Sequence, residues 1–340
     1  MRKFGKIAGI FAVVFLLAAN PVFSSDLLNL GNMQNAVTTF ADSMAKALPF
    51  YSTVGLNWSD AYIGQLIGAP PHFGFGISAG FTSLKLDAIS GILNQMGMGD
   101  FSNISSMLPG GLGDMIGFPL PAYTVDLRLG GFGIPFDLGL KFGILDTSKI
   151  DVLADMLPGI VFDYMLAGAD FRYALIDGGA IPFRLSVGGG FNYLKGGVSA
   201  LISGASQSIN TGSGNTITLN VDPTFGLTWE TTVVEAKAQV SFPLAIITPY
   251  AGIGASYSWS KAGYFVKANL SSSDQGKLNG LGLSDISNAG FESIQEVSGF
   301  NVRAFGGLSL NLFVIRIDAT IMYDIFNSAL GATVGLRFQL

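Results

Sequence analysis

The chain has 340 residues, of which 49% are hydrophobic and only 12% are charged, and its formal net charge is −5. Soluble proteins usually contain about 25% charged residues, and this acidic chain lacks the basic surface that nucleic-acid binding requires. The absence of cysteine excludes disulfides and a lipid-modified N-terminal cysteine. Beyond the N-terminus, no stretch offers the ~20 uninterrupted apolar residues of a membrane-spanning helix.

The first 24 residues have the layout of a secretory signal peptide, with a positive n-region, an apolar core and a cleavage site. A retained anchor helix is the alternative, although the apolar run is short for one. We therefore predict that residues 1–24 are removed during export. These features are carried by Arg2, Lys3 and Lys6, by residues 7–19, and by Val22 and Ser24 at positions −3 and −1.

Residues 25–70 form a segment of a different kind, with helical spacing of apolar residues from Asp26 to Leu48. Pro49 is expected to end this helix. Its apolar face has to be buried, and two placements remain open. The segment lies either in the periplasm across the mouth of a barrel, or inside the barrel as a plug.

Period-two alternation of apolar and polar residues begins at residue 71 and predicts strands with one apolar and one polar face. A change of parity near Gly168 suggests a β-bulge, and residues 216–221 are expected to extend the strands as a protruding hairpin. The last strand should pair with the first, around Phe73 to Phe81. The alternating segments are residues 72–82, 122–130, 136–144, 162–173, 183–193, 228–240, 251–259, 301–312, 314–324 and 332–340.

The connections between these segments distinguish a membrane barrel from a soluble sandwich. Long connections (83–120, 195–223 and 261–298) and a medium one (146–159) alternate with short ones, and only the last outer loop, residues 327–331, is brief. Outer-membrane barrels have tight periplasmic turns and longer extracellular loops, and interfacial aromatic rings. The sequence therefore predicts an all-β, antiparallel transmembrane barrel at residues 71–340, with about ten strands in a range of roughly 8–14, an N-terminal helical segment and helical extracellular loops. The expected interfacial rings are Tyr193, Trp259 and Tyr323 at the outer ends, and Phe183, Tyr250 and Phe338 at the inner ends.

Charged residues of both signs fall on the polar face and should line the lumen. They either pair across neighbouring strands and fill a narrow interior, or line a conduit. Inward glycine and serine leave space for water, a plug helix or a ligand. The predicted lumen-lining residues are Asp126, Arg128, Asp137, Lys141, Arg184, Glu235, Lys237, Arg303, Arg316, Asp318 and Arg337, with Asp163 and Arg172 also expected to face inward.

The long outer connections are unusually apolar. They either pack as a lid on the barrel mouth or bind an apolar ligand, since methionine-rich surfaces adapt to varied apolar partners. The candidate residues are Leu86, Ile89, Leu93, Met96, Met107, Met115, Leu153 and Met156.

Two resemblances follow from these segments. The stretch GLNWSDAY, residues 55–62, resembles a segment that precedes the first strand in an uncharacterised family of bacterial outer-membrane proteins. In architecture alone, the N-terminal segment and the apolar outer helices are similar to outer-membrane channels for hydrophobic compounds. Such resemblances imply a porin-like barrel in the bacterial outer membrane, inserted by the barrel-assembly machinery. The chain departs from the usual aromatic terminus, since it ends in Leu340 with Phe338 two residues before it.

The function expected from this pattern is a narrow or gated passive channel for small solutes, apolar ones included. A structural or surface-interaction barrel without transport is the alternative. No enzymatic activity, cofactor or metal site is expected, because the single histidine, His72, falls at the inner start of a strand and fits an interface residue better than a base. The solute and the oligomeric state stay open.

Overall fold

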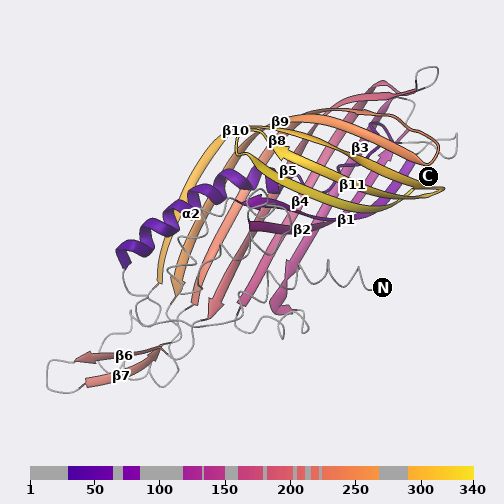
Figure 1. The fold of residues 1–340 in the computed structure, drawn as a ribbon. Helices are drawn as coiled ribbons and strands as arrows, with labels where there is room; N and C mark the ends of the chain where they lie inside the picture. Colours follow the sequence, from indigo (N-terminus) through magenta and orange to yellow (C-terminus); the bar gives the residue numbers. More distant parts are fainter. Residues whose placement is uncertain are drawn as a thin grey trace, which may run out of the picture.

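The computed structural model describes residues 30–63, 72–84, 118–131, 134–149, 160–178, 182–201, 205–210, 216–221, 224–267 and 290–340. Ten antiparallel strands close into one barrel, in the order β1-β12-β11-β10-β9-β8-β5-β4-β3-β2 (Figure 1). This confirms the predicted fold class, including the pairing of the last strand with the first, where Phe75 lies opposite Phe338. The barrel strands are β1 (His72–Leu84), β2 (Phe118–Gly130), β3 (Phe136–Asp146), β4 (Ile160–Ile176), β5 (Arg184–Leu201), β8 (Thr224–Ser241), β9 (Ile247–Lys267), β10 (Gly290–Leu312), β11 (Ile315–Asp324) and β12 (Ala329–Gln339).

The predicted two-faced pattern holds along most of the wall. On β1, for example, Phe75 and Ile77 are exposed on the outer surface, while Gly74 and Gly76 face inward. The strand ends that the long connections join lie at one end of the barrel, which we call the outer end. The short turns and the start of β1 lie at the other, the inner end. This arrangement is that of outer-membrane barrels, whose longer loops are extracellular. Within the part of the chain that the structure describes, no helix is both long and apolar enough to span a bilayer.

Several strands extend well past the ~9–11 residues that span a membrane. β9 has 21 residues and β10 has 23, so both reach into what the sequence suggested was a connection. Between β5 and β8, the strands β6 (Ala205–Asn210) and β7 (Thr216–Val221) form a separate two-stranded sheet, which agrees with the expected hairpin. A short 3₁₀ helix, η4 (Thr147–Lys149), follows β3.

A row of charged side chains marks the outer limit of the lipid-facing surface. Lys195, Glu230, Lys261 and Glu296 are register partners across β5, β8, β9 and β10. The Lys261 ammonium lies 2.7 Å from the Glu296 carboxylate. Trp259, two residues before Lys261, is half exposed on the same face. Charged groups are costly against lipid and aromatic rings are favoured at its boundary, so the strands project into water beyond this row.

Strand β4 corrects the predicted bulge near Gly168. The strand is regular there, and its register shift lies between Ala174 and Ile176. Parity does not change, because Phe162, Tyr164 and Leu166 are buried on the inner face rather than facing lipid.

Two further expectations about facing were wrong. Asp163, expected inward, is exposed on the outer face of the projecting part of β4, where water can solvate it. Tyr250, expected at the lipid interface, is buried in the lumen, where its hydroxyl hydrogen-bonds Thr320.

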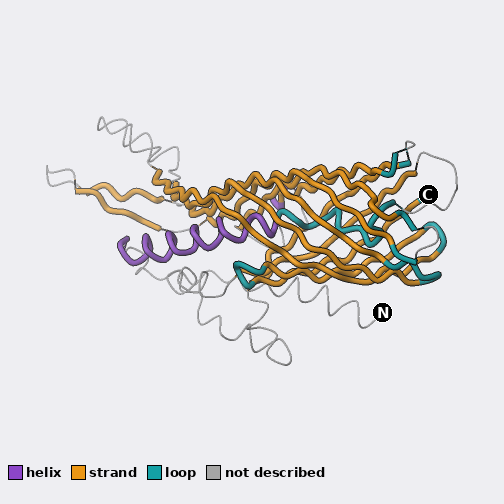
Figure 2. Tube along the Cα trace, turned by 90° about the horizontal axis from the view of Figure 1, so that it is seen from above, coloured by secondary structure: helices purple, strands orange, loops and turns teal. Residues whose placement is uncertain are grey.

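The N-terminal helix α2 (Leu30–Tyr51) continues through Pro49 instead of ending there. The Ser52 amide still donates to the Leu48 carbonyl oxygen, 2.9 Å away, so the last turn is closed. The helix packs against β8, β9, β10 and β1 at the outer end, and the chain then passes inside the ring of strands (Figure 2). The side-chain amide of Asn327, in the β11–β12 turn, donates to the main-chain carbonyl oxygen of Lys46, 3.2 Å away. Since that turn is at the outer end, the earlier residues of α2 lie farther out, along the projecting strands.

Candidate functional site: the filled lumen

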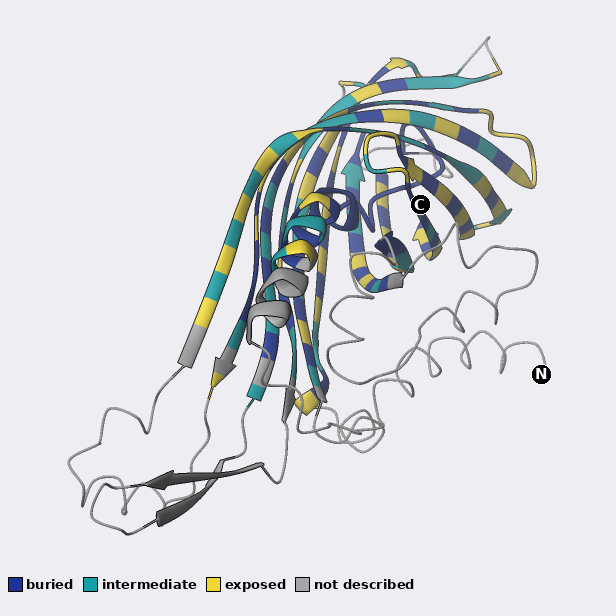
Figure 3. Cartoon of the chain, turned by 60° about the vertical axis from the view of Figure 1, so that its left-hand side comes forward, coloured by how far each residue is buried: buried dark blue, intermediate teal, exposed yellow. Residues whose placement is uncertain are grey.

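Residues 51–63, called the lumen segment below, run along the inside of the barrel from its outer to its inner end. Every one of them is buried (Figure 3). Tyr51 donates to the Pro121 carbonyl oxygen near the outer end of β2, and the Ile63 amide donates to Asp137 at the inner start of β3. Contacts with β1, β2, β3, β4, β5, β8, β11 and β12 surround the segment. The structure therefore places it in the lumen rather than in the periplasm.

The outer half of the lumen is apolar and aromatic. Tyr164 from β4, Trp229 from β8 and Tyr264 from β9 face inward and are buried against Leu48 and other residues of α2. The rings of Phe162 and Trp229 lie 6.1 Å apart. A barrel interior with this lining has to be covered by an apolar surface, and the C-terminal half of α2 provides it.

The inner half of the lumen is charged, and most of its charges pair within the wall. The Arg128 guanidinium binds Asp137 on β3 and Asp170 on β4, and Arg172 binds Asp137 at 2.7 Å. Lys237 binds Asp170 as well. Removing one member of such a buried pair usually costs about 3–5 kcal/mol.

Two more pairs complete the wall network on β8 to β12. Arg303 lies 3.0 Å from Glu235, and Arg337 binds Asp318, with Nη2 2.5 Å from Oδ1. These pairs agree with the interpretation in which lumen charges neutralise each other across strands.

The wall binds the lumen segment largely through its main chain. The Lys141 ammonium donates to the carbonyl oxygens of Ser52 and Val54, at 2.6 and 2.7 Å. The Gln239 amide donates to the carbonyl oxygens of Trp58 and Ser59, at 2.7 and 3.1 Å. These donors satisfy carbonyl groups that no strand or helix pairs.

Further wall groups continue this pattern at both ends of the segment. Asp126 accepts from the Leu56 amide at 3.3 Å. Ser241 accepts from the Ala61 amide at 2.9 Å. The wall thus binds the main chain of the segment at several points along its length.

Two side chains of the lumen segment make specific contacts. Two guanidinium groups lie over the Trp58 ring, that of Arg337 at 4.5 Å and that of Arg128 at 5.4 Å from the ring centroid. Cations over an aromatic face are attracted by its quadrupole. The Asp60 carboxylate lies 3.6 Å from Arg184 and 3.6 Å from Arg316.

The structure locates all the predicted lumen-lining residues on the inner face, where most are buried and Arg184 and Arg316 are partly exposed. The prediction missed Asp60 and Trp58, although both belong to the GLNWSDAY stretch, whose composition was the available signal. The eight candidate lid or ligand residues lie outside the described residues, as does the predicted signal peptide. These candidates are Leu86, Ile89, Leu93, Met96, Met107, Met115, Leu153 and Met156.

His72 is not an interface residue as predicted. Its side chain is 2% exposed and is buried at the inner end beside Gly131. Among the described residues, no group of three or more His, Cys, Asp or Glu side chains is arranged to hold a metal ion.

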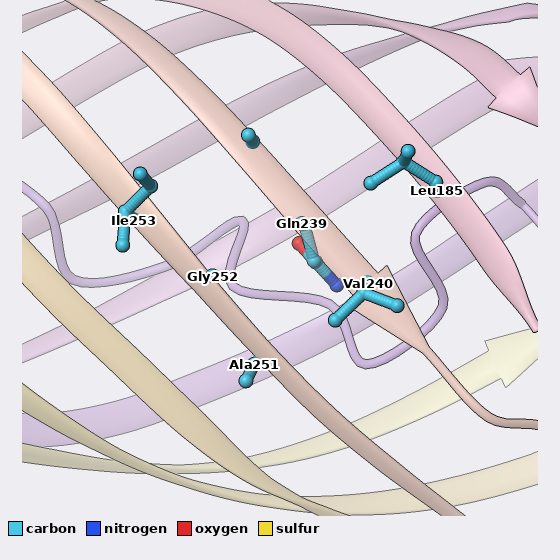
Figure 4. A pocket seen from close by; sticks show the side chains of 7 residues that line it. Leu185, Gln239, Val240, Ala251, Gly252 and Ile253 are labelled. Atoms are coloured by element: carbon cyan, nitrogen blue, oxygen red, sulfur yellow. The ribbon is translucent and has the colours of Figure 1, made fainter.

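A shallow depression also lies on the outer surface of the wall, over β5, β8 and β9 (Figure 4). Small residues such as Ala238 and Ala251 form its floor between Leu185, Val240 and Ile253. It faces the membrane and is lined by apolar atoms, so lipid chains suffice to fill it. It is separate from the lumen.

No protein-family model matches this chain, and no curated protein matches it. Solved structures with a similar fold include Ail, the attachment invasion locus protein of Yersinia pestis, at 11% identity, a TM-score of 0.27 and coverage of 79% of this chain and 97% of that one. A major outer membrane protein from Thermus thermophilus is 9% identical, with a TM-score of 0.34 and coverage of 80% of this chain and 100% of that one. The translocator domain of the autotransporter NalP from Neisseria meningitidis is 10% identical, with a TM-score of 0.34 and coverage of 89% of this chain and 98% of that one. The three TM-scores are all below 0.5, so these likenesses carry no argument about family or function, and the barrel is defined by the strand pairing of the chain itself.

Proposed function

We propose that this outer-membrane barrel is a gated channel for small solutes, which its own N-terminal segment closes. The observation that supports the proposal is the path of residues 51–63, which fill the lumen and contact strands on all sides (Figure 3). Free diffusion through the barrel would require this segment to move.

The wall is built so that the segment can move without leaving most of the wall charges unpaired. Arg128, Arg303 and Arg337 bind carboxylates of other wall strands, not of the lumen segment. Breaking a buried pair is costly, whereas these pairs stay intact when the segment leaves.

The charged inner half favours small polar solutes, because a passing apolar molecule would have to cross a ring of ion pairs. Uptake of apolar solutes would depend on the outer connections, residues 85–117 and 150–159, which lie outside the described residues.

Conductance of the refolded protein in a planar bilayer tests the proposal. We expect rare openings of the wild-type protein and a larger open fraction for Lys141→Met combined with Gln239→Leu, because both substitutions remove donors to the main chain of the lumen segment. Lys46→Met is the matched control, since its side chain is half exposed on α2 outside the lumen. Identical sealed membranes for all three proteins, each with heat-modifiable gel mobility, would rule the channel out.

A structural or surface-interaction barrel is the second candidate. The projecting halves of β9 and β10 and the separate β6–β7 sheet favour it, because they extend protein surface beyond the lipid boundary. Two results together would support this candidate over the channel: no conductance by the purified protein, and a change in adhesion or envelope integrity in cells that lack the protein.

A further inference from the structure

Two arginines at the inner end of the barrel face a carboxylate that the wall does not supply. Arg184 begins β5, and Arg316 is the second residue of β11. Their guanidinium groups lie 3.6 Å from the two different carboxylate oxygens of Asp60, on the lumen segment. Among the described residues, Asp60 is the carboxylate within ion-pair distance of either arginine, whereas the other lumen arginines each bind a carboxylate of a strand.

Asp60 fills this position incompletely. A charge-assisted hydrogen bond between a guanidinium and a carboxylate is usually about 2.7–2.9 Å long, and both contacts here are longer. The Nε atoms of Arg184 and Arg316 and the Oδ1 atom of Asp60 are buried without a hydrogen-bond partner among the described residues. One more donor reaches the carboxylate: the side-chain amide of Gln339 lies 3.3 Å from Asp60 Oδ2. Arg172 donates to the main-chain carbonyl oxygen of Asp60, 2.6 Å away, and so holds the backbone beside the site.

The surrounding wall adds a positive bias to the position. On the lumen-facing side of the described strands, eight cations face six carboxylates. The cations are Arg128, Lys141, Arg172, Arg184, Lys237, Arg303, Arg316 and Arg337, and the carboxylates are Asp126, Asp137, Asp170, Glu235, Asp318 and Asp324. A lumen with this balance attracts anions.

The position is also within reach of solvent at the inner end. The side chains of Arg184 and Arg316 are 19% and 17% exposed, whereas that of Asp60 is 1% exposed. A soluble anion at the inner end could therefore contact the arginines before the lumen segment moves.

We propose that Arg184 and Arg316 form an anion-binding site that Asp60 occupies as a tethered ligand, and that a small free carboxylate or phosphate displaces it. Arginine suits this role because its planar fork matches both groups in a bidentate manner. The inference rests on the proposed gated channel and deepens it: displacement of Asp60 would loosen the lumen segment, and the solute class would be small anions.

Calorimetric titration of inorganic phosphate into the detergent-solubilised full chain tests the site directly. We expect Asp60→Asn to bind phosphate about 10-fold more tightly than the wild-type protein, because one charged contact no longer competes. Adding Arg184→Gln and Arg316→Gln to Asp60→Asn should abolish that gain. Asp42→Asn is the matched control, since Asp42 pairs with Lys46 on the exposed side of α2 and should leave phosphate affinity unchanged.

Equal affinity of Asp60→Asn and wild type, or full binding by the triple variant, would overturn the site. If Asp60→Asn lacks heat-modifiable mobility and so has not folded, the wild-type protein is compared instead with the Arg184→Gln, Arg316→Gln double variant. We expect the double variant to lose the weak phosphate binding of the wild-type protein, and equal binding by the two would overturn the proposal.

Conductance separates this inference from the function on which it rests. Phosphate binding at Asp60→Asn in a barrel that never conducts keeps the site and removes the channel. Openings of the Lys141→Met, Gln239→Leu protein without phosphate binding at Asp60→Asn keep the channel and remove the site.

Discussion

Lys141 shows how single residues of the wall control the lumen segment. Its ammonium is buried on β3 and donates to two carbonyl oxygens of the segment, those of Ser52 and Val54. Because the contacts are to main-chain atoms, they would form with many different sequences at these positions. The position of the lumen segment is therefore set largely by donors of the wall that contact its main chain.

Replacing Lys141 with methionine should lower the free energy of unfolding by on the order of 3 kcal/mol, because two buried carbonyl oxygens lose a charged donor. Urea unfolding followed by tryptophan fluorescence measures the change. Lys46→Met removes an exposed ion pair on α2 and should cost less than about 1 kcal/mol. Equal losses for the two variants would show that the carbonyl contacts contribute nothing.

Gly74 on β1 permits the close approach of Trp58. A Cβ atom at this position would lie 2.4 Å from two carbon atoms of the Trp58 ring. Gly74→Ala should therefore push the ring away from Arg337, shift the tryptophan emission and cost about 1–3 kcal/mol. Gly299→Ala on β10 is the control, because a Cβ there meets no atom within 4 Å. Unchanged emission in Gly74→Ala would contradict the packing described here.

For single residues, the sequence predicted the side chains of the barrel wall better than those of the segment inside the lumen. Period-two parity was enough to select residues such as Arg128 and Arg337, since a strand fixes the face of each residue. Trp58 and Asp60 lie in an irregular stretch with no period, so the pattern did not select them, although a plug inside the barrel was one of the two placements open for residues 25–70.

Helix α2 explains why one element was interpreted wrongly. Apolar residues on a barrel strand are expected to face lipid, and Phe162 and Tyr164 were assigned that way. The helix supplies an apolar surface inside the barrel, so apolar residues near the outer end of β4 face inward. Alternation gives the period of a strand, whereas the facing depends on what occupies the lumen, which a strand pattern does not contain.

Leu48 tests the contribution of this helix. It is 0% exposed within the apolar outer half of the lumen, and Leu48→Ala should lower the free energy of unfolding by about 2–5 kcal/mol through lost contacts and a cavity. Chemical unfolding of the refolded barrel measures the loss. Lys46→Ala, two residues away on the exposed side of α2, should change it by only about 0.5 kcal/mol. A small loss for Leu48→Ala would mean that α2 rests loosely on the wall.

The path of the chain sets the orientation of the whole molecule. Alternating connection lengths predicted the closed barrel and its long-loop end from the sequence alone, because that pattern depends only on chain length between strands. The direction of the N-terminal segment was not predictable, since a helix can fold into either mouth. In the structure, the segment descends from the outer end, and β1 begins at the inner end only after the chain has crossed the lumen.

This path predicts that Lys46, although it precedes every barrel strand, is reached from outside the cell. The chain has no cysteine, so single cysteines can be labelled without background. Lys46→Cys should react with a membrane-impermeant maleimide on intact cells, because its side chain is half exposed at the outer end. Ile246→Cys, 60% exposed in the β8–β9 turn at the inner end, should react only after the outer membrane is permeabilised. Labelling of Lys46→Cys only after permeabilisation would place α2 in the periplasm and reverse the direction in which the segment enters the lumen.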